Sequence, residues 1–550
     1  MSSAPSGFPS DIPVIQETFK NWSQMITVPN AWTCAPTSED DVVRVCNWAA
    51  GASYRVRARG IMHGWSPLTV TEADGPNMML IDMTGLNKIR RPTAASGDQP
   101  AQVVVQTGAT MDALMNVLEW SSGGPPNLGF GFPHIPAPGH ITVGGALAIN
   151  AHGTGVPTPP NDALPSPYGS LSNQVLAFTA VVTLSGSDAY VAHTFTRDDT
   201  DAKAFLAHCG RALLLNVTLH VVENYNLRCQ SSFPSTTTLF APPIKGTPLP
   251  GSVGAYLNES GRVEVIWFPF SDEPWLKVWT VAPAKPAGSV QVSTPYNYGF
   301  SDNLPLSLTE LLKQVLGGTP SLTPEFTKAF GGFAALSAAQ DIWGASKNTL
   351  IYVQDTTLRV TANGYAILMQ KHQVQQAVAD VTAKFSQMLD SYQRENLWPI
   401  NAPLEIRVTG LDDPAKIGAA SAQSPVISAL SVDPVVQKQA WDVAVWFDVL
   451  TIIPDAQDTQ KAYQFYEELE AWIYAHFADG FRVSPEWSKG WAYTARGGAW
   501  ANQTVIDAVR RTFTDGRSAD DTWSWEQQTL ASYDSGGLFL NTFLEQLLGP

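Results

Sequence analysis

The chain has 550 residues, of which 44% are hydrophobic and only 15% are charged, against a usual charged share of about 25%. This length exceeds what one ordinary hydrophobic core accommodates, and the composition excludes disorder over most of the chain. The 33 basic and 49 acidic residues give a net charge of −16, so the surface repels phosphate backbones and no nucleic-acid partner is expected.

Membrane-spanning segments and metal sites are not expected either. The longest apolar stretches, 211–222 and 441–453, carry polar or charged residues and stay below the roughly 18 residues of a spanning helix. The four cysteines are too scattered for a disulfide framework or a zinc site, and we expect buried free thiols at Cys34, Cys46, Cys209 and Cys229. The first residues lack the basic and apolar regions of an export signal, which leaves the compartment open.

Alternating helix and strand patterns begin near Trp32. Ser38 and Asp41 have the spacing of a capping box, and apolar residues then recur at helical spacing. Strands are predicted at 54–60, 79–86 and 101–108. Thr110 is predicted to start an amphipathic helix that ends before Gly123. This part of the chain is predicted to form a mixed α+β domain.

A second pattern begins near residue 251. Period-two alternation rich in β-branched and aromatic residues predicts strands at 263–270, 349–355, 357–360, 365–371, 404–410 and 441–450. Asn363-Gly364 predicts a hairpin turn between two of them. Helices are predicted at 374–392 and 461–477. The pattern indicates one antiparallel sheet covered by helices.

The predicted fold is therefore a two-domain α+β protein. Its parts are residues 1–235, a second domain at 236–474, and a segment at 475–550 that returns to the first domain. Segments rich in Pro, Gly and Ser occur at 157–170, 241–253 and 284–305. Loops of this length are either lids and binding loops or surface insertions without function, and the sequence does not separate these readings.

Two glycine-containing segments have the character of ligand-binding turns. In 58–67, a strand ends at Arg59-Gly60 and a turn containing His63 follows, which suits a nest of backbone N–H groups for a pyrophosphate. In 141–155, Gly144 and Gly145 permit close backbone approach before a helix expected from Ala146. Taken alone, a histidine such as His63 is more often a structural residue, and the glycines are equally compatible with a packing role.

The order of the two segments is more specific than either alone. The succession of 36–42 (PTSEDDV), 59–63 (RGIMH), 142–145 (TVGG) and 150–153 (NAHG) resembles the vanillyl-alcohol oxidase superfamily of flavoproteins. Residues 168–173, 210–222 and 533–544 are similar to later segments of the same family. The likeness covers most of residues 32–222 and about the last seventy residues.

The resemblance implies that FAD binds to these segments and that His63 is bonded to the flavin 8α-methyl group. Many relatives place Gly directly before this His, whereas Ile61 and Met62 precede it here, so Met62 is expected to distort the turn. The implied FAD-binding residues are Arg59, Gly60, Ile61, Met62, His63, Gly64, Ser66, Thr142, Val143, Gly144, Gly145, Asn150, His152, Gly153, Val217 and Asn541.

Within the superfamily, the chain is most similar to the cholesterol oxidases that hold FAD covalently. The likeness extends over 59–67, 262–281, 295–305, 404–412, 441–452 and 485–493, and so includes the second domain. It implies a sterol substrate, O2 as electron acceptor, transient contact with a membrane or lipid surface, and export from a bacterial cell. It leaves the oligomeric state open.

The residue types suit this chemistry. Glu405 and Arg407 are two positions apart on a predicted strand and therefore share a face. Glu264 lies among apolar residues, where an ionised carboxylate needs a partner, and Arg407 is the partner we expect. Lys489, between two tryptophans, is a candidate to reach the flavin pyrimidine ring. The alternative is that Glu405, Arg407 and Lys489 are solvated surface residues.

The hypothesis is oxidation of a 3β-hydroxysterol to the ketone, with O2 reduced to H2O2. Glu405 or Glu264 would accept the hydroxyl proton while hydride passes to the flavin, and Arg407 would stabilise negative charge. The same carboxylate could then shift the ring double bond into conjugation. Two alternatives are an alditol or lactone oxidase of the same superfamily, and a sterol-carrying protein without redox activity.

Overall fold

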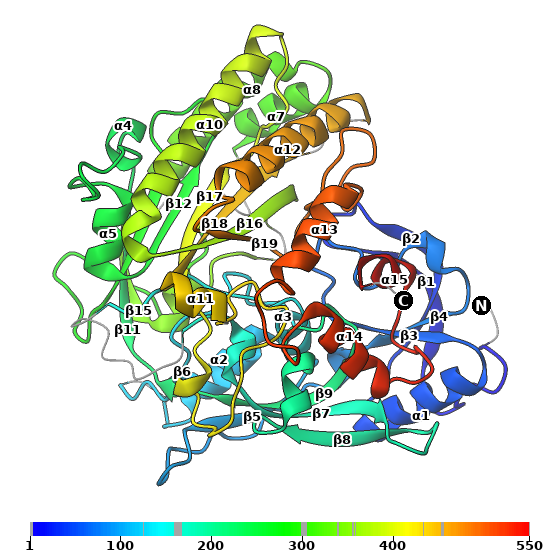
Figure 1. Cartoon of the computed structure of the whole chain (residues 1–550). Coiled ribbons are helices and arrows are strands. Elements are labelled where there is room, and N and C mark those ends of the chain that lie inside the picture. The colour runs from blue at the N-terminus through cyan, green and yellow to red at the C-terminus, as the bar shows by residue number, and fades with distance from the viewer. Residues whose placement is uncertain are drawn as a thin grey trace.

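The computed structural model describes residues 4–124, 126–158, 168–298, 305–337, 340–354, 357, 359–432, 434–452 and 456–548. They form the two-domain α+β fold expected from the sequence (Figure 1), with two four-stranded sheets in the first domain and a nine-stranded sheet in the second. Parts of the predicted loops at 157–170 and 284–305 lie outside the described residues.

The first small sheet has the order β1 (Val14–Lys20), β2 (Thr27–Cys34), β4 (Met78–Asp82) and β3 (Arg55–Arg59). Helix α1 (Glu39–Gly51) packs Val42, Val45, Cys46 and Ala49 into its core. The predicted capping box is confirmed, because the Ser38 side chain accepts from the Asp41 N–H and the Asp41 side chain accepts from the Ser38 N–H.

The second small sheet has the order β5 (Gln102–Gln106), β9 (Leu213–His220), β7 (Val175–Thr183) and β8 (Tyr190–Thr196). Helix α2 (Met111–Trp120) starts after the predicted cap Thr110, whose hydroxyl accepts from Ala113 N–H. Helix α3 (Val143–Ala148) packs against the same core. It begins three residues before the predicted start at Ala146, because Thr142 caps it.

The nine-stranded sheet forms the second domain. Its order is β14 (Val290–Gln291), β15 (Asp341–Ala345), β11 (Asn226–Ser232), β13 (Trp275–Val281), β12 (Val263–Trp267), β17 (Leu404–Gly410), β18 (Val443–Thr451), β16 (Thr361–Met369) and β19 (Arg482–Pro485). All neighbours are antiparallel except β14 and β15. β11 lies before residue 236 and β19 after residue 474, so the sheet extends past both predicted boundaries.

The two faces of this sheet have different roles. Alternate residues of the central strands pack against α5 (Val253–Ser260), α10 (Val374–Arg394) and α12 (Ala456–His476); on β17 these are Leu404, Ile406 and Val408. Figure 1 shows α10 and α12 lying across the sheet. Because successive side chains on a strand point to opposite faces, Glu405 and Arg407 face the other way, toward the first domain.

Two strand predictions in this domain are wrong. Residues 349–354 do not form a strand: α9 (Ser346–Leu350) occupies their start, and Val353 makes only an isolated bridge to Pro138. Residues 357, 359 and 360 precede β16 without joining the sheet, and residues 355 and 358 of the two predicted strands lie outside the described part. Asn363-Gly364 is no turn either, because it lies inside β16, where Gly364 pairs with Asp448 of β18.

The C-terminal segment contacts the first domain. Asp534 accepts hydrogen bonds from Arg211 and Tyr190, and Glu545 forms a salt bridge of 2.5 Å with Arg55. The remaining helices and strands are β6 (Phe130–Gly131), β10 (Val222–Glu223), α4 (Thr236–Leu239), α7 (Leu306–Leu316), α8 (Thr323–Ser337), α11 (Pro434–Gln439), α13 (Gln503–Thr512), α14 (Trp523–Ser532) and α15 (Thr542–Leu548).

All four cysteines are free and buried, as predicted. In the described part of the chain, no helix is both long and apolar enough to cross a bilayer.

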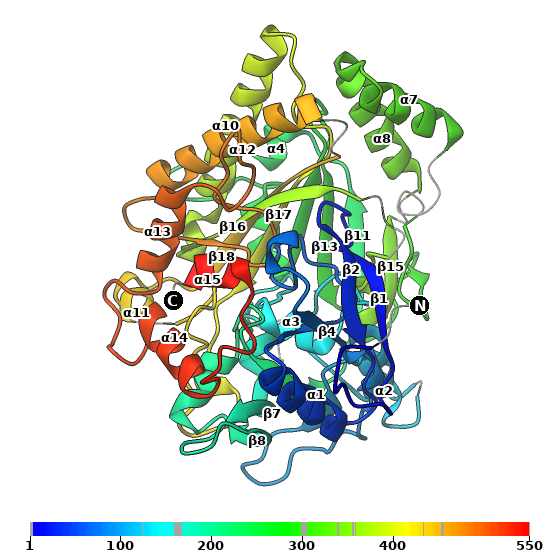
Figure 2. The same ribbon diagram turned by 90° about the vertical axis from the view of Figure 1, so that its right-hand side faces the viewer.

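The helical hairpin of α7 and α8 lies at one edge of the second domain (Figure 2). Its residues Phe326 and Phe330 pack against Phe268 of the sheet region and also line the central cavity.

Candidate active site

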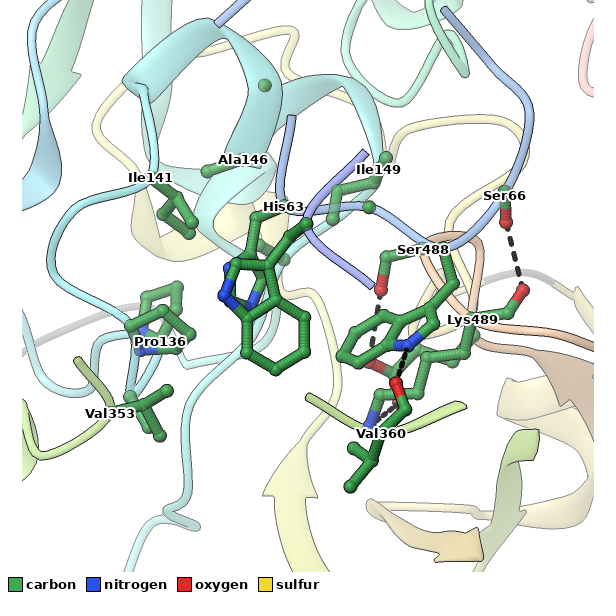
Figure 3. Close-up of a pocket in the computed structure, with 18 of the residues that line it drawn as sticks. His63, Ser66, Pro136, Ile141, Ala146, Ile149, Val353, Val360, Ser488 and Lys489 are labelled. Atoms are coloured by element: carbon green, nitrogen blue, oxygen red, sulfur yellow. Dashed lines mark hydrogen bonds and ion pairs between the residues drawn. The ribbon is translucent and has the colours of Figure 1, made fainter. Parts of the chain in front are cut away.

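A cavity of about 390 Å³ lies where the two domains meet. The first domain contributes the segments 60–70 and 145–154, and the second contributes the face of the nine-stranded sheet turned away from α10 and α12. In Figure 3, His63 lies near Ala146 and Ile149 of the α3 region, and Ser488 and Lys489 line the same pocket. The two glycine segments singled out in the sequence thus meet at one cavity.

The turn after β3 presents unused backbone donors to this cavity. Met62 has a φ of 59°, in the left-handed region that non-glycine residues rarely adopt. Within the described residues, the N–H groups of Ile61, Met62, His63 and Gly64 donate to no other protein group. Successive free N–H groups around a left-handed residue form an anion-binding nest. Met62 therefore forms part of the nest rather than disrupting the turn.

The second segment approaches this turn closely. A Cβ on Gly60 would lie 2.2 Å from Thr142 Oγ1, so only glycine allows the Thr142 side chain to lie against this turn. The N–H groups of Val143 and Gly144 donate to Ala109 and Thr107 carbonyls, at 2.8 Å each. These two groups are thus used inside the protein, and Gly145 is the glycine of the pair that lines the cavity.

His63 is buried against other rings. Its Nδ1 lies 3.0 Å from His140 Nε2, and its ring centroid lies 4.7 Å from that of Trp22. Burial lowers the pKa of His63 to about 3, with smaller contributions from His140 and Lys489. The imidazole is therefore neutral at physiological pH, and a neutral ring nitrogen keeps the lone pair that a covalent bond to carbon requires.

The other predicted FAD-binding residues divide into two groups. Gly60, Ile61, Met62, His63, Gly64, Ser66, Thr142, Gly145, Asn150, His152 and Gly153 line the cavity; Arg59, Val143, Gly144, Val217 and Asn541 do not. Arg59 forms salt bridges with Glu17 and Asp82 behind the turn. Asn541 donates to the Pro67 carbonyl at 3.0 Å, and so supports the cavity wall from behind. Val217 is in the core of the β5–β9 sheet.

Arg407 is the centre of a buried ion cluster on the sheet wall. It donates to Glu264 Oε1 at 2.7 Å, to Glu405 Oε2 at 2.6 Å and to Asp448 Oδ2 at 3.1 Å. Strand register brings these groups together, since Glu264 pairs with Arg407 across β12 and β17, and Glu405 pairs with Asp448 across β17 and β18. The predicted Glu264–Arg407 pair is thus present, and the solvated alternative is excluded.

The pKa directions follow from this geometry. Burial raises the pKa of Glu264, but Lys277 and Arg407 outweigh it and hold that pKa below its usual range. Burial lowers the pKa of Arg407, but Glu405 and Glu264 outweigh it and raise that pKa well above its usual range. Both groups are therefore charged across the physiological range.

Lys489 is a second buried cation in this cluster. Its Nζ lies 2.6 Å from Asp448 Oδ2 and 3.2 Å from Glu486 Oε2, so it is not a solvated lysine. Ser66 Oγ donates to the Trp487 and Lys489 carbonyls at 2.6 and 2.9 Å. The turn that carries His63 is thereby tied to the loop that carries Lys489.

Sequence reasoning missed three residues of this site: Asp448, Glu486 and His140. Asp448 is fully buried within the apolar strand β18, and it is one of the charged residues that interrupt the apolar stretch 441–453. An acidic residue in a strand with no exposed position is a usable signal of a buried charge partner. Glu486 lies three residues before Lys489, a weaker signal, and His140 had none.

Comparisons with known proteins agree with this architecture. The family model "Cholesterol oxidase, substrate-binding" matches residues 226–549, and the model "FAD binding domain" matches residues 31–184. The structure of a solvent-stable cholesterol oxidase has 43% sequence identity and a TM-score of 0.93, covering 99% of this chain and 100% of that one. Cholesterol oxidase from B. sterolicum has 35% identity and a TM-score of 0.92, covering 99% of both chains.

More distant relatives are lactone-oxidising proteins. L-gulonolactone oxidase of Mus musculus is 26% identical over 256 residues, which are 46% of this chain and 49% of that protein. The chain thus spans about half the length of this relative. L-gulono-1,4-lactone dehydrogenase of Mycobacterium tuberculosis is 25% identical over 404 residues, 72% of this chain and 78% of that protein.

The fold and the site define an FAD-binding flavoprotein of the vanillyl-alcohol oxidase type, an oxidoreductase with a separate substrate-binding domain. The match over residues 226–549 and the two solved structures specify the group further. The chain belongs to the cholesterol oxidase family.

The residues present suit FAD. The nest at Ile61–Gly64 offers N–H donors of the kind that bind a pyrophosphate. The side-chain amide of Asn150 is buried at the cavity and has no hydrogen-bond partner on either its Nδ2 or its Oδ1, which suits the polar atoms of a ribityl chain or a flavin ring.

Substitution of Gly60 by Ala tests the close approach of the two segments. The new Cβ would push Thr142 away and is expected to cost about 1–3 kcal/mol of unfolding free energy as overpacking. We expect the purified variant to retain less flavin absorbance per chain than the wild type. Gly51→Ala is the matched control, since no atom lies within 4 Å of its new Cβ. Equal flavin content in all three proteins would contradict this role of Gly60.

Proposed function

We propose that this protein oxidises the 3β-hydroxyl group of a sterol to the ketone, using FAD held at the central cavity and reducing O2 to H2O2. One observation carries the proposal: the nest, the Arg407 cluster and a wide apolar wall line a single cavity. FAD supplies the hydride acceptor and its reoxidation by oxygen. The protein supplies binding, orientation and control of protons.

The apolar wall favours a sterol over a sugar derivative. It is made by side chains from the sheet, α8 and their connections: Ile266, Phe268, Phe326, Phe330, Leu450 and Ile452. Such a surface leaves the hydroxyl groups of an alditol or a sugar lactone without hydrogen-bond partners, which is costly in a buried site. A fused apolar ring system has no hydrogen bonds to lose when it is buried against the same wall.

Of the two candidate bases, Glu405 suits the role better than Glu264. Glu264 Oε1 accepts from both Arg407 and Tyr352, and its Oε2 lies 3.4 Å from Lys277 Nζ. A carboxylate held ionised on both oxygens is a weak proton acceptor. Glu405 uses Oε2 for Arg407 and is more exposed, with 17% of its side chain accessible against 1% for Glu264. Glu405 can therefore accept the sterol hydroxyl proton. Once it has released that proton, the same carboxylate can carry a proton from C4 to C6 in the isomerisation.

Arg407 provides fixed positive charge beside the reacting atoms. Three carboxylates fix its guanidinium in orientation, so it need not reorganise when negative charge develops on the substrate oxygen. Lys489 adds a second cation at the same cavity. The covalent bond from His63 to the flavin belongs to the same proposal; the neutral, cavity-lining imidazole supports it.

Contact with a lipid surface is the proposed route of substrate entry. Leu306 begins α7 and Leu336 lies near the end of α8, with 76% and 90% of their surfaces exposed. The same hairpin carries Phe326 and Phe330 of the cavity wall. Exposed leucines next to the wall of a sterol cavity suit transient insertion among lipid chains.

A substrate comparison tests the proposal directly. Peroxide release from the purified holoenzyme is expected with cholesterol and not with L-gulono-1,4-lactone or a sugar alcohol. Peroxide from the lactone alone would establish the lactone-oxidase alternative. A purified protein without a flavin absorbance band would instead favour a sterol carrier.

Arg407→Lys tests the planar fork. Lysine keeps the charge but cannot contact three carboxylates at once, so turnover with cholesterol is expected to fall by about 100-fold. Arg228→Lys is the matched control, because Arg228 forms a bidentate pair with Asp341 outside the cavity. Turnover of Arg407→Lys equal to that of this control would remove Arg407 from the mechanism.

His63→Ala tests the covalent bond. After acid precipitation, the yellow colour is expected to stay with the wild-type chain and to appear entirely in the supernatant of the variant. The partly exposed His193, replaced by Ala, serves as the control and should keep the colour on the chain. Release of all colour from the wild type would show that the flavin is not covalently bound.

A further inference from the structure

Asp448 and Glu486 form a buried carboxyl pair beside the cavity. Asp448 lies on β18 and Glu486 directly follows β19. Asp448 Oδ2 accepts from Arg407 at 3.1 Å and lies 2.6 Å from Lys489 Nζ. The other Asp448 oxygen, Oδ1, and Glu486 Oε2 are buried, and neither has a hydrogen-bond partner among the described residues.

Gly364 makes room for this pair. It lies opposite Asp448 in the β16–β18 register. A Cβ on Gly364 would lie 2.3 Å from Asp448 Oδ1 and 3.3 Å from Glu486 Oε2, so both oxygens converge on one glycine. The absence of a side chain here explains why an Asn-Gly pair occurs inside a strand instead of at a turn.

Two ionised carboxylates cannot donate a hydrogen bond to each other, and their like charges repel at this depth. The charges around the cavity also leave room for one proton. The four buried or half-buried carboxylates are Glu264, Glu405, Asp448 and Glu486, and the Lys and Arg side chains in contact with them are Lys277, Arg407 and Lys489. His152 Nε2 lies 3.9 Å from Glu486 Oε2, which is beyond hydrogen-bond distance, and it is not counted as a cation. One proton on the pair makes the cluster neutral.

We infer that Asp448 and Glu486 share one proton, and that this pair acts as a positioning unit that holds Lys489 and Arg407 toward the cavity. The pair does so without adding an uncompensated negative charge to the flavin-binding site.

The surroundings of the pair support this assignment. β17 presents Glu405 and Arg407, the loop after β19 presents Lys489, and His152 places Nε2 3.9 Å from Glu486 Oε2. β16 presents Gly364 at the contact. Burial and the neighbouring Glu486 raise the pKa of Asp448 well above its usual range. Burial also raises the pKa of Glu486, but Lys489 and His152 outweigh it and hold that pKa below its usual range. The two groups therefore titrate as one unit that holds one proton.

The sign of the pH effect follows. Between the ordinary pKa of a carboxyl group, about 4, and the raised pKa of the pair, the folded protein binds one more proton than the unfolded chain. As pH rises through that interval, this contribution disfavours the folded state. Loss of the proton at high pH would leave the cluster with an excess negative charge, which opposes further negative charge at the cavity. The pair thus predicts an alkaline limit to activity.

Infrared spectroscopy of the holoenzyme tests the shared proton without any turnover. The difference spectrum of wild type minus Asp448→Asn at neutral pH is expected to show the carbonyl stretching band of one protonated carboxyl group, because other buried carboxyl groups such as Glu526 contribute equally to both proteins. Glu486→Gln should also lack the band, because Asp448 then ionises against Arg407 and Lys489. The exposed Asp507, replaced by Asn, is the control and should keep the band. If Asp448→Asn does not fold, loss of the wild-type band on raising the pH carries the same information.

Three results would overturn the inference. A wild-type spectrum identical to that of Asp448→Asn would show that no proton is shared, and a band retained in Glu486→Gln would show a lone protonated Asp448. The third result concerns the positioning role, which rests on the proposed function. In Asp448→Asn, the alkaline limb of the kcat/KM profile for cholesterol is expected to move to higher pH. An unmoved limb would refute the positioning role. Absence of turnover in the wild type would refute the proposed function and leave the infrared result intact.

Discussion

The contact of Arg407 with three carboxylates is the interaction around which the cavity is organised. Its guanidinium joins β12, β17 and β18 through Glu264, Glu405 and Asp448. Removing one partner from such a group leaves a buried charge uncompensated, which is typically strongly destabilising. Arg407 therefore both fixes the central strands on their cavity side and supplies the positive charge that the proposed oxidation uses.

The first domain contributes a second constraint, the close approach of two backbone segments at Gly60 and Thr142. It sets the free N–H groups of the His63 turn at the cavity, and Ser66 then ties this turn to the loop of Lys489. The flavin-binding turn and the ion cluster are thus linked through that loop. Both domains are needed to enclose the cavity, so the proposed reaction takes place at the interface between them.

The sequence predicted the fold class, most elements and much of the site, because these depend on local patterns. Period-two alternation placed Glu405 and Arg407 on one face, and the buried position of Glu264 implied its charged partner. The wrong predictions concern segments whose structure is decided by tertiary contacts. Asn363-Gly364 has the composition of a turn, but the Asp448 carboxyl above Gly364 decides its place inside β16.

Other parts of the site could not be read from the sequence for similar reasons. His140 contacts His63 from 77 residues away, and no local pattern marks it. The segment 349–355 alternates like a strand, yet it connects α9 to the cavity wall, with Tyr352 donating to Glu264. The resemblance indicated Val217 and Asn541 as cofactor residues, whereas the structure places both behind the cavity wall.

The central claim is that one cavity brings a sterol hydroxyl group to a bound flavin under the control of the Arg407 cluster. Mixing the holoenzyme with cholesterol in the absence of oxygen tests it most directly, because flavin reduction is then observed apart from reoxidation. The account predicts rapid bleaching of the oxidised flavin spectrum with one sterol ketone formed per flavin. A flavin that stays oxidised in the presence of excess cholesterol would contradict it.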